Sequence, residues 1–133
     1  MYSVTKLIHF CYGHRLLEHQ GKCRHLHGHN AVAEILIERP KLDARGMAMD
    51  FDDIKAVVSL WIDSELDHKT ILCAKDPLVK PLKDKGEPIV TIPTNPTAEA
   101  LAKHIFDYAR GRGLPVSSVR LWETPNNCAC YKE

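Results

Sequence analysis

Six of the eight histidines lie between His9 and His29, and two of them are two positions apart in His27-Gly28-His29. In an extended strand, side chains two positions apart share a face and are separated by about 6.6 Å, so these two imidazoles can converge on one ion. His25 has the same parity, but about 13 Å of extended chain separates it from His29. That span is too long for three rings of one straight strand, so a third ligand must come from another segment.

His14 is the nearest candidate for this third ligand, because it follows the first predicted strand and faces the histidine segment across a hairpin. Three neutral imidazoles with one open position are typical of a catalytic zinc site, whereas a structural site is closed by four ligands. The alternative is a chance cluster of surface histidines. The parity of His27 and His29 continues into the apolar face from Ala31 to Ile37, which favours the metal site.

Two further groups have the chemistry of proton transfer. Cys23 lies between Lys22 and Arg24, whose positive charges favour a thiolate; an inert thiol is the alternative. In the pair Asp67-His68, the carboxylate can orient and polarise the imidazole as a proton carrier. A solvated helix end is the other interpretation of this pair.

Glu123 is unusual because it continues the apolar strand face of Val119 and Leu121. A buried carboxylate is unfavourable unless a bound ligand or a donor satisfies it, so Glu123 is a candidate ligand-binding residue. Cys128 and Cys130 are also two positions apart, but no histidine lies near them in the chain. We therefore expect no second metal site there.

Hydrophobic periodicity predicts the elements that must position these groups. Alternating apolar residues predict strands over residues 2–11, 27–38, 89–92 and 116–124, with a short terminal strand that ends at Tyr131. Helical spacing predicts a helix from a cap at Asp50 to about Leu66, and a second that opens at Asn95-Pro96-Thr97 and ends at Gly111. Residues 73–88 contain three prolines and are expected to be an irregular connection. The order ββαβαββ predicts an α+β domain with two helices on one face of an antiparallel sheet.

Length and composition predict one domain over residues 1–133. A hydrophobic fraction of 44% with 26% charged residues excludes intrinsic disorder, and a formal charge of +1 recruits neither nucleic acid nor membrane by bulk charge. No apolar run approaches the roughly 18–20 residues that span a bilayer, and the start of the chain lacks a signal-peptide layout. We expect a cytoplasmic protein whose five cysteines are reduced.

Together these motifs resemble the 6-pyruvoyl-tetrahydropterin synthase family, in particular its 6-carboxy-tetrahydropterin synthase branch in queuosine precursor synthesis. The matching segments, which cover nearly the whole chain, are Phe10-Cys11-Tyr12-Gly13-His14-Arg15-Leu16, Cys23-x-x-x-His27-Gly28-His29, Asp50-Phe51, Leu66-Asp67-His68, Pro96-Thr97-Ala98-Glu99 and Glu123-Thr124. Their order and spacing together are specific. The resemblance implies a tunnelling fold, in which the sheets of neighbouring subunits join into a barrel. Two trimers would then stack as a homohexamer with active sites at subunit interfaces.

The resemblance also implies roles for individual residues. The implied zinc ligands are His14, His27 and His29. The implied catalytic thiol is Cys23, and Asp67 and His68 would complete its proton relay. Glu123 would anchor a pterin ring, and Thr97 and Glu99 match positions near the pterin pocket. Two features depart from the family pattern: Leu72 stands where many relatives have Asn, and the stretch 73–92 is longer than in the shortest relatives. Neither removes a proposed catalytic group.

The implied activity is that of a zinc-dependent lyase with no external redox cofactor. It would convert 7,8-dihydroneopterin triphosphate to 6-carboxy-5,6,7,8-tetrahydropterin, with release of acetaldehyde and triphosphate. Three residues separate Cys23 from His27, a spacing associated with the carboxy-forming branch. The nearest alternative is a 6-pyruvoyl-tetrahydropterin synthase, which leaves the side chain uncut. A non-catalytic pterin- or metal-binding protein is the alternative of another class, but it would not need Cys23, Asp67 and His68 together.

Overall fold

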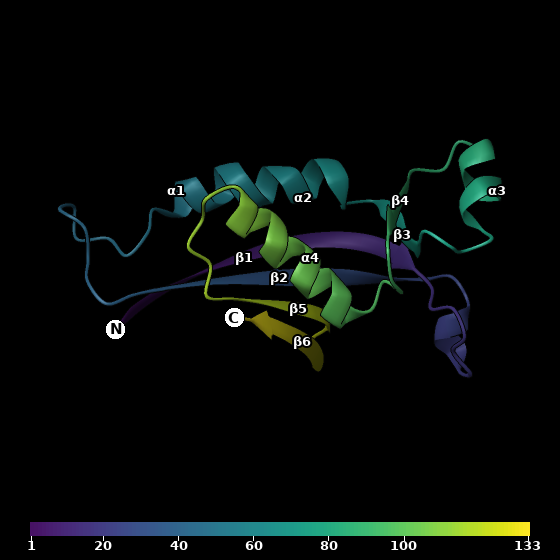
Figure 1. The fold of residues 1–133 in the computed structure, drawn as a ribbon, viewed down its shortest axis with the longest axis horizontal. Coiled ribbons are helices and arrows are strands. Elements are labelled where there is room, and N and C mark those ends of the chain that lie inside the picture. The colour runs from purple at the N-terminus through teal and green to yellow at the C-terminus, as the bar shows by residue number, and fades with distance from the viewer.

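The computed structural model describes residues 1–133 and contains one six-stranded sheet in the order β4-β3-β1-β2-β5-β6. The strands are β1 (Tyr2–His14), β2 (His27–Arg39), β3 (Lys69–Cys73), β4 (Ile89–Ile92), β5 (Ser118–Thr124) and β6 (Asn127–Lys132). The helical segments are η1 (Lys22–Arg24), α1 (Phe51–Ile54), η2 (Lys55–Ser59), α2 (Leu60–Glu65), α3 (Val79–Asp84) and α4 (Ala98–Gly111). Helices α1, α2 and α4 lie on one side of the sheet, while α3 lies at one end of the molecule (Figure 1). The expected α+β class is confirmed.

The long antiparallel pair of β1 and β2 forms the centre of the sheet. Its register places Ile8 opposite Ala33 and Phe10 opposite Ala31, and all four side chains are buried. Because directly opposed residues in an antiparallel pair share a face, the hairpin has one apolar face along most of its length. Both strands are longer than predicted, and β1 extends past its expected end to His14.

Two helices, α1–η2–α2 and α4, lie side by side and cover this apolar face. A carboxylate oxygen of Asp50 accepts the Asp52 N–H at 2.8 Å, as expected of the helix cap. The helix continues from α1 to α2 through one π-helical segment, η2, which the periodicity did not predict. Trp61 stacks on Tyr108 of α4 with ring centroids 4.0 Å apart, so the two helices also pack against each other.

The sheet is mixed, which corrects the expectation of an antiparallel one. Strand β3 pairs in parallel with both β1 and β4. It was missed because Ile71–Cys73 is a continuous buried run without alternation, as is typical of strands covered on both faces. The connection over 73–88 is not irregular throughout, since it contains α3. Pro81 is compatible with α3 because it lies in the first turn, where its missing N–H has no intrahelical partner to lose.

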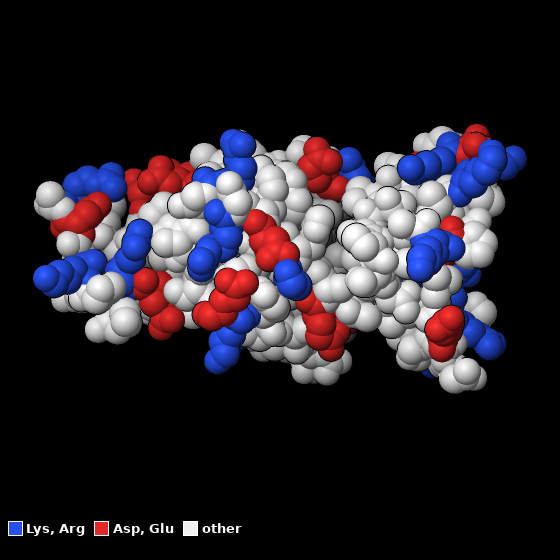
Figure 2. All heavy atoms as spheres, in the orientation of Figure 1, with Lys and Arg blue, Asp and Glu red and all other residues white.

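Charged side chains of both signs are mixed on one face of the molecule. On the face seen in Figure 2, lysine and arginine are interspersed with aspartate and glutamate, and no large area has one sign. None of the helices has the length and apolar character needed to cross a membrane.

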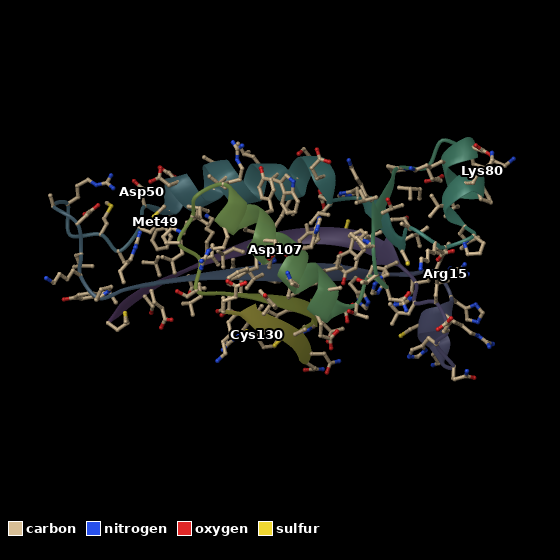
Figure 3. The ribbon with its side chains drawn as sticks, in the orientation of Figure 1. Arg15, Met49, Asp50, Lys80, Asp107 and Cys130 are labelled. Carbon is tan, nitrogen blue, oxygen red and sulfur yellow. The ribbon has the colours of Figure 1, made fainter.

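A partly buried ion pair fixes the chain directly after β1. The guanidinium of Arg15 donates from Nε to Asp76 Oδ2 at 2.8 Å, and from a second nitrogen to Oδ1 (Arg15 is labelled in Figure 3). The Asp76 side chain is fully buried and also accepts the Leu78 N–H at 2.8 Å. The hydrogen bonds from Arg15 lower the pKa of Asp76 by more than burial raises it. This pair holds the end of β1 against the segment that follows β3.

We predict that Asp76→Asn lowers the free energy of unfolding at pH 7 by about 2–3 kcal/mol, below the roughly 3–5 kcal/mol of a fully buried pair. The reduction is smaller because the Arg15 side chain is still 22% exposed. A carboxyl with a lowered folded pKa stabilises the protein above its unfolded pKa of 3.8, and this contribution disappears as the pH falls through the folded pKa. Urea unfolding of metal-free protein should therefore show a steeper loss of stability from pH 5 to 3 in the wild type than in the variant.

Asp84→Asn is the matched control, because Asp84 pairs with Lys80 on the exposed surface of α3. It should change stability by less than about 0.5 kcal/mol. Identical pH profiles for the wild type and Asp76→Asn would contradict the role given to the buried pair.

Candidate metal centre

The hairpin register brings His14, His27 and His29 together at the end of its apolar face. His14 lies directly opposite His27, and His29 lies opposite Tyr12. One ligating atom from each of the three histidines lies within 4.8 Å of the others, and His14 Nε2 is 3.1 Å from His29 Nε2. The expected third histidine is therefore next to the pair, at a spacing that one ion could bridge.

Backbone carbonyls orient two of the three rings. His14 Nδ1 lies 2.7 Å from the Pro96 oxygen, and His27 Nδ1 lies 2.7 Å from the His25 oxygen. A carbonyl only accepts, so both Nδ1 atoms carry the proton and both Nε2 atoms keep a lone pair for a metal ion. Burial lowers the pKa of His14, although the Pro96 carbonyl and a nearby carboxylate oppose the shift. The neutral ring that results is the form that binds metal, so the donor set fits zinc.

Glu123 and Tyr12 complete this cluster. Glu123 Oε2 lies 3.2 Å from His29 Nε2 and 3.4 Å from His14 Nε2, and it accepts the Tyr12 hydroxyl at 2.9 Å. Burial, followed by the negative charge and hydrogen bond of Glu123, raises the pKa of Tyr12, so the phenol remains a neutral donor. Sequence reasoning found Glu123 but gave Tyr12 no role. The available signal was that Tyr12 shares strand parity with His14.

A second cluster forms where α2 leads into β3. Asp67 Oδ1 accepts the Cys11 N–H at 2.9 Å, and Asp67 Oδ2 lies 2.8 Å from His68 Nδ1. Burial raises the pKa of Asp67, but the hydrogen bonds from Cys11 and His68 outweigh burial and lower it. His68 has a φ of 59°, which turns the chain into β3, and its side chain is 80% exposed. An ionised carboxylate therefore holds a solvent-accessible imidazole.

The structure does not bring Cys23 to this second cluster within one chain. Cys23 is half-buried in η1 and makes no hydrogen bond to Asp67 or His68, whereas the Cys11 sulfur lies within 4.8 Å of ligating atoms in both. A relay between Cys23 and the Asp67–His68 pair stays a prediction.

The remaining expected site residues lie in or next to α4. The Thr97 hydroxyl oxygen accepts the Ala100 N–H at 3.1 Å and so caps α4, while Glu99 is exposed in the first turn of that helix. Leu72, the departure from the family pattern, is fully buried in β3. The pterin-pocket roles of Thr97 and Glu99 therefore stay predictions.

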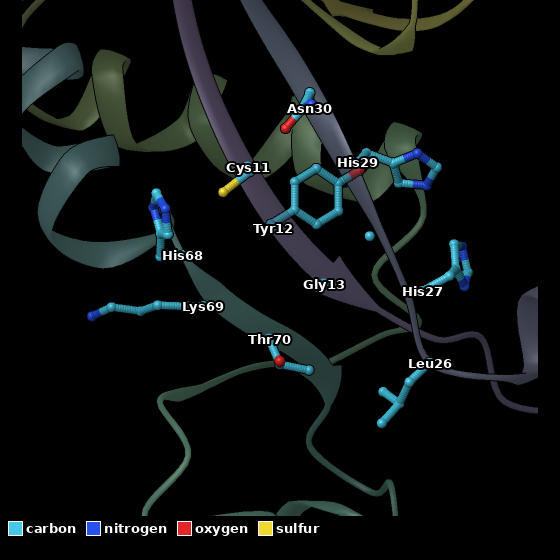
Figure 4. Close-up of a pocket in the computed structure, with 11 residues that line it drawn as sticks. Cys11, Tyr12, Gly13, Leu26, His27, His29, Asn30, His68, Lys69 and Thr70 are labelled. Carbon is cyan, nitrogen blue, oxygen red and sulfur yellow. The ribbon is translucent and has the colours of Figure 1, made fainter.

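An open pocket of about 560 Å³ lies next to both clusters. Figure 4 shows Cys11 and His68 on one side of it and His27 and His29 on the other, with the Tyr12 ring between them. Gly13 and Gly28 also line the pocket and are paired across the hairpin, so neither residue of this pair fills the space with a side chain of its own. The volume suits a small organic ligand.

Gly28 has a close neighbour that limits what can replace it. A Cβ atom there would lie 3.2 Å from the Tyr12 carbonyl oxygen, which is tighter than ordinary contact. A glycine between His27 and His29 therefore lets the two strands approach while the flanking imidazoles keep their shared face.

Comparison with known proteins gives matches over almost the whole chain. The model of a family described as 6-pyruvoyl tetrahydropterin synthase matches residues 3–133. A 6-carboxy-5,6,7,8-tetrahydropterin synthase from Rickettsia felis is 39% identical, over 100% of this chain and 99% of that protein. One from Aquifex aeolicus is 33% identical, over 99% of this chain and 98% of that protein.

Solved structures have the same fold. An uncharacterized protein from Wolinella succinogenes matches with a TM-score of 0.87 at 28% identity, over 99% of this chain and 98% of that chain. The Caenorhabditis elegans 6-pyruvoyl tetrahydropterin synthase matches with a TM-score of 0.74 at 26% identity, over 99% of this chain and 95% of that chain. The tunnelling fold expected for the single chain is thereby confirmed, while the joining of sheets from neighbouring subunits into a barrel stays a prediction.

We predict one zinc ion per chain, bound through His14, His27 and His29. Single replacement of any of the three by Ala should weaken zinc binding by more than about 100-fold, since outer-shell partners alone contribute about 10–100-fold. Metal analysis after dialysis against a zinc buffer would measure this. His25→Ala is the matched control, because it removes a neighbouring imidazole but keeps the carbonyl that accepts from His27. Full zinc occupancy after loss of both His27 and His29 would contradict the site.

Proposed function

The chain belongs to the 6-pyruvoyl tetrahydropterin synthase family, and on that premise we propose that it is a zinc-dependent 6-carboxy-tetrahydropterin synthase. It would convert 7,8-dihydroneopterin triphosphate and water to 6-carboxy-5,6,7,8-tetrahydropterin, acetaldehyde and triphosphate, a step toward queuosine. The observation that carries this proposal is the convergence of three histidines and Glu123 in one cluster, with His27 and His29 lining an open pocket. The names of the full-length relatives support the carboxy-forming product.

His14, His27 and His29 would hold the zinc ion through their Nε2 atoms. When bound, zinc supplies Lewis-acid chemistry: it polarises side-chain oxygens of the substrate and stabilises negative charge when a proton leaves the adjacent carbon. The carbonyls of Pro96 and His25 keep two of the rings in the required tautomer, and burial keeps His14 neutral.

Proton transfer in this proposal belongs to Cys23 and His68, acting on opposite sides of the reacting carbon. The Asp67 carboxylate orients His68 through Nδ1 and leaves Nε2 facing solvent, where it can accept or donate a proton. The electron balance is internal, since the side-chain carbon next to the ring becomes the carboxyl carbon while the dihydropterin ring becomes tetrahydropterin. No external redox cofactor is needed.

The separation of Cys23 from Asp67 and His68 supports an active site shared between subunits. We propose that the Asp67–His68 pair of one chain serves the Cys23 of a neighbour in a homohexamer built as a dimer of trimers, with residues 1–133 acting as one domain. The two edge strands of the sheet, β4 and β6, have no further partner strand within the chain. Unpaired edges can join the sheets of adjacent subunits, as the expected barrel requires.

Substrate recognition in this proposal rests on Glu123, which would accept hydrogen bonds from the ring N–H and amino group of the pterin. Its carboxylate is partly exposed, at 23%, so a ligand can reach it. Thr97 and Glu99 would lie near the same pocket through the start of α4. The small-molecule substrate is the only partner proposed besides other copies of the chain.

Product identity tests the proposal most specifically. Zinc-loaded protein incubated with 7,8-dihydroneopterin triphosphate should yield 6-carboxy-5,6,7,8-tetrahydropterin and one equivalent of acetaldehyde, measured by mass spectrometry and aldehyde trapping. The three-residue spacing from Cys23 to His27 fixes the thiol relative to the substrate side chain, and a displacement of about 1 Å can change rates by about 100-fold. Accumulation of 6-pyruvoyl-tetrahydropterin without acetaldehyde would instead assign the pyruvoyl-forming activity, and binding without turnover would indicate a non-catalytic protein.

We predict that Cys23→Ala retains zinc and the folded state but loses at least about 100-fold in kcat, the lower range for a group that transfers a proton. Cys128→Ala, which removes an exposed thiol of β6, is the control and should keep full activity. Normal turnover by Cys23→Ala would exclude Cys23 from the mechanism. Loss of zinc from that variant would make Cys23 a metal ligand instead.

A further inference from the structure

Tyr12 is a buried side chain whose one polar atom bonds to the carboxylate of Glu123. We propose that Tyr12 is a positioning residue, whose hydroxyl holds Oε2 of Glu123 in place and competes with the metal for this oxygen, so that the carboxylate stays available to the pterin. This inference rests on the proposed function, because it assigns to Glu123 the pterin as ligand.

The position of the Tyr12 hydroxyl is set by the sheet and the packing around the ring. The side chain is only 3% exposed and lies opposite His29 in the hairpin register. Its ring stacks on Phe10 at 5.6 Å between centroids and meets His14 edge-on at 5.1 Å. A ring held on three sides by strand neighbours presents its oxygen at one place, and a buried phenol needs a partner there.

Glu123 has a competing site within reach. Its Oε2 atom lies 3.2–3.4 Å from the two Nε2 atoms of His29 and His14, the same atoms that face the proposed ion. Carboxylate oxygens are common zinc ligands, so a free Glu123 could close the fourth position that a catalytic site must leave open. The hydrogen bond from Tyr12 occupies one lone pair of Oε2, so this oxygen has one acceptor site fewer for a metal ion.

The other carboxylate oxygen is left for the ligand. Oε1 of Glu123 makes no hydrogen bond within the chain, and Oε2 keeps a second lone pair after accepting from Tyr12. Both carboxylate oxygens can therefore still accept a hydrogen bond. This pair of acceptors matches the ring N–H and amino donors on one edge of a pterin. Tyr12 thereby favours ligands that present two adjacent donors.

A double-mutant cycle tests this coupling with neopterin, a fluorescent pterin, titrated into zinc-loaded protein. Tyr12→Phe keeps the ring and removes only the hydroxyl, and should weaken neopterin binding about 10-fold. Glu123→Gln should also weaken it, and adding Tyr12→Phe to that variant should cause no further loss. With the triphosphate substrate, Tyr12→Phe should raise KM about 10-fold and change kcat by less than about 3-fold.

Tyr131→Phe is the matched control, because it also removes a tyrosine hydroxyl bonded to a glutamate, here Glu133, far along the chain from the histidines. It should bind neopterin as the wild type does. Thermal unfolding and zinc content, measured on every variant, should show Tyr12→Phe folded with one zinc per chain.

The outcomes separate this inference from the function on which it rests. Wild-type affinity in Tyr12→Phe, together with weakened binding in Glu123→Gln, would overturn the role of Tyr12 and leave the pterin site intact. Loss of zinc or of folding in Tyr12→Phe would show that Tyr12 supports the histidine cluster and would also overturn the proposal. Absence of neopterin binding by the wild type would overturn both the inference and the proposed function.

Discussion

The register of the β1–β2 hairpin is the constraint on which the site depends. It places His14 opposite His27 and Tyr12 opposite His29, so four side chains of the cluster share one face because of backbone pairing alone. A slip of one residue in either strand would send that strand's members of the cluster to the opposite face. The apolar pairs farther along the hairpin resist such a slip, because they would be exposed as well. The hydrophobic core therefore specifies the arrangement of the histidine cluster.

The same alternation separates the site into two parts. The histidines, Tyr12 and Glu123 lie on the face covered by the helices, whereas Cys11, between Phe10 and Tyr12 in β1, points to the opposite face. Asp67 and His68 are held at the β1 edge by hydrogen bonds to the Cys11 backbone. The histidine cluster and the Asp67–His68 pair thus belong to different elements of one chain, which fits the proposal of an active site completed by a neighbouring subunit.

Much of this arrangement could be predicted from local patterns. Strand parity identified His27 and His29, the hairpin suggested His14, and a carboxylate on an apolar face singled out Glu123. Tyr12 escaped notice because a tyrosine among apolar strand residues has an ordinary explanation in core packing. Strand β3 lacked the alternation that marks a half-buried strand, and its parallel pairing depends on tertiary contacts. The distance of Cys23 from Asp67 and His68 likewise depends on the path of the whole chain.

In the proposed site, three imidazoles and no cysteine hold the metal. X-ray absorption at the zinc edge of the reconstituted protein tests it directly, because zinc–nitrogen and zinc–sulfur distances are clearly different. We expect three imidazole nitrogens at about 2.0–2.1 Å and one further light atom. A sulfur shell at about 2.3 Å, or fewer than three imidazoles, would contradict the account.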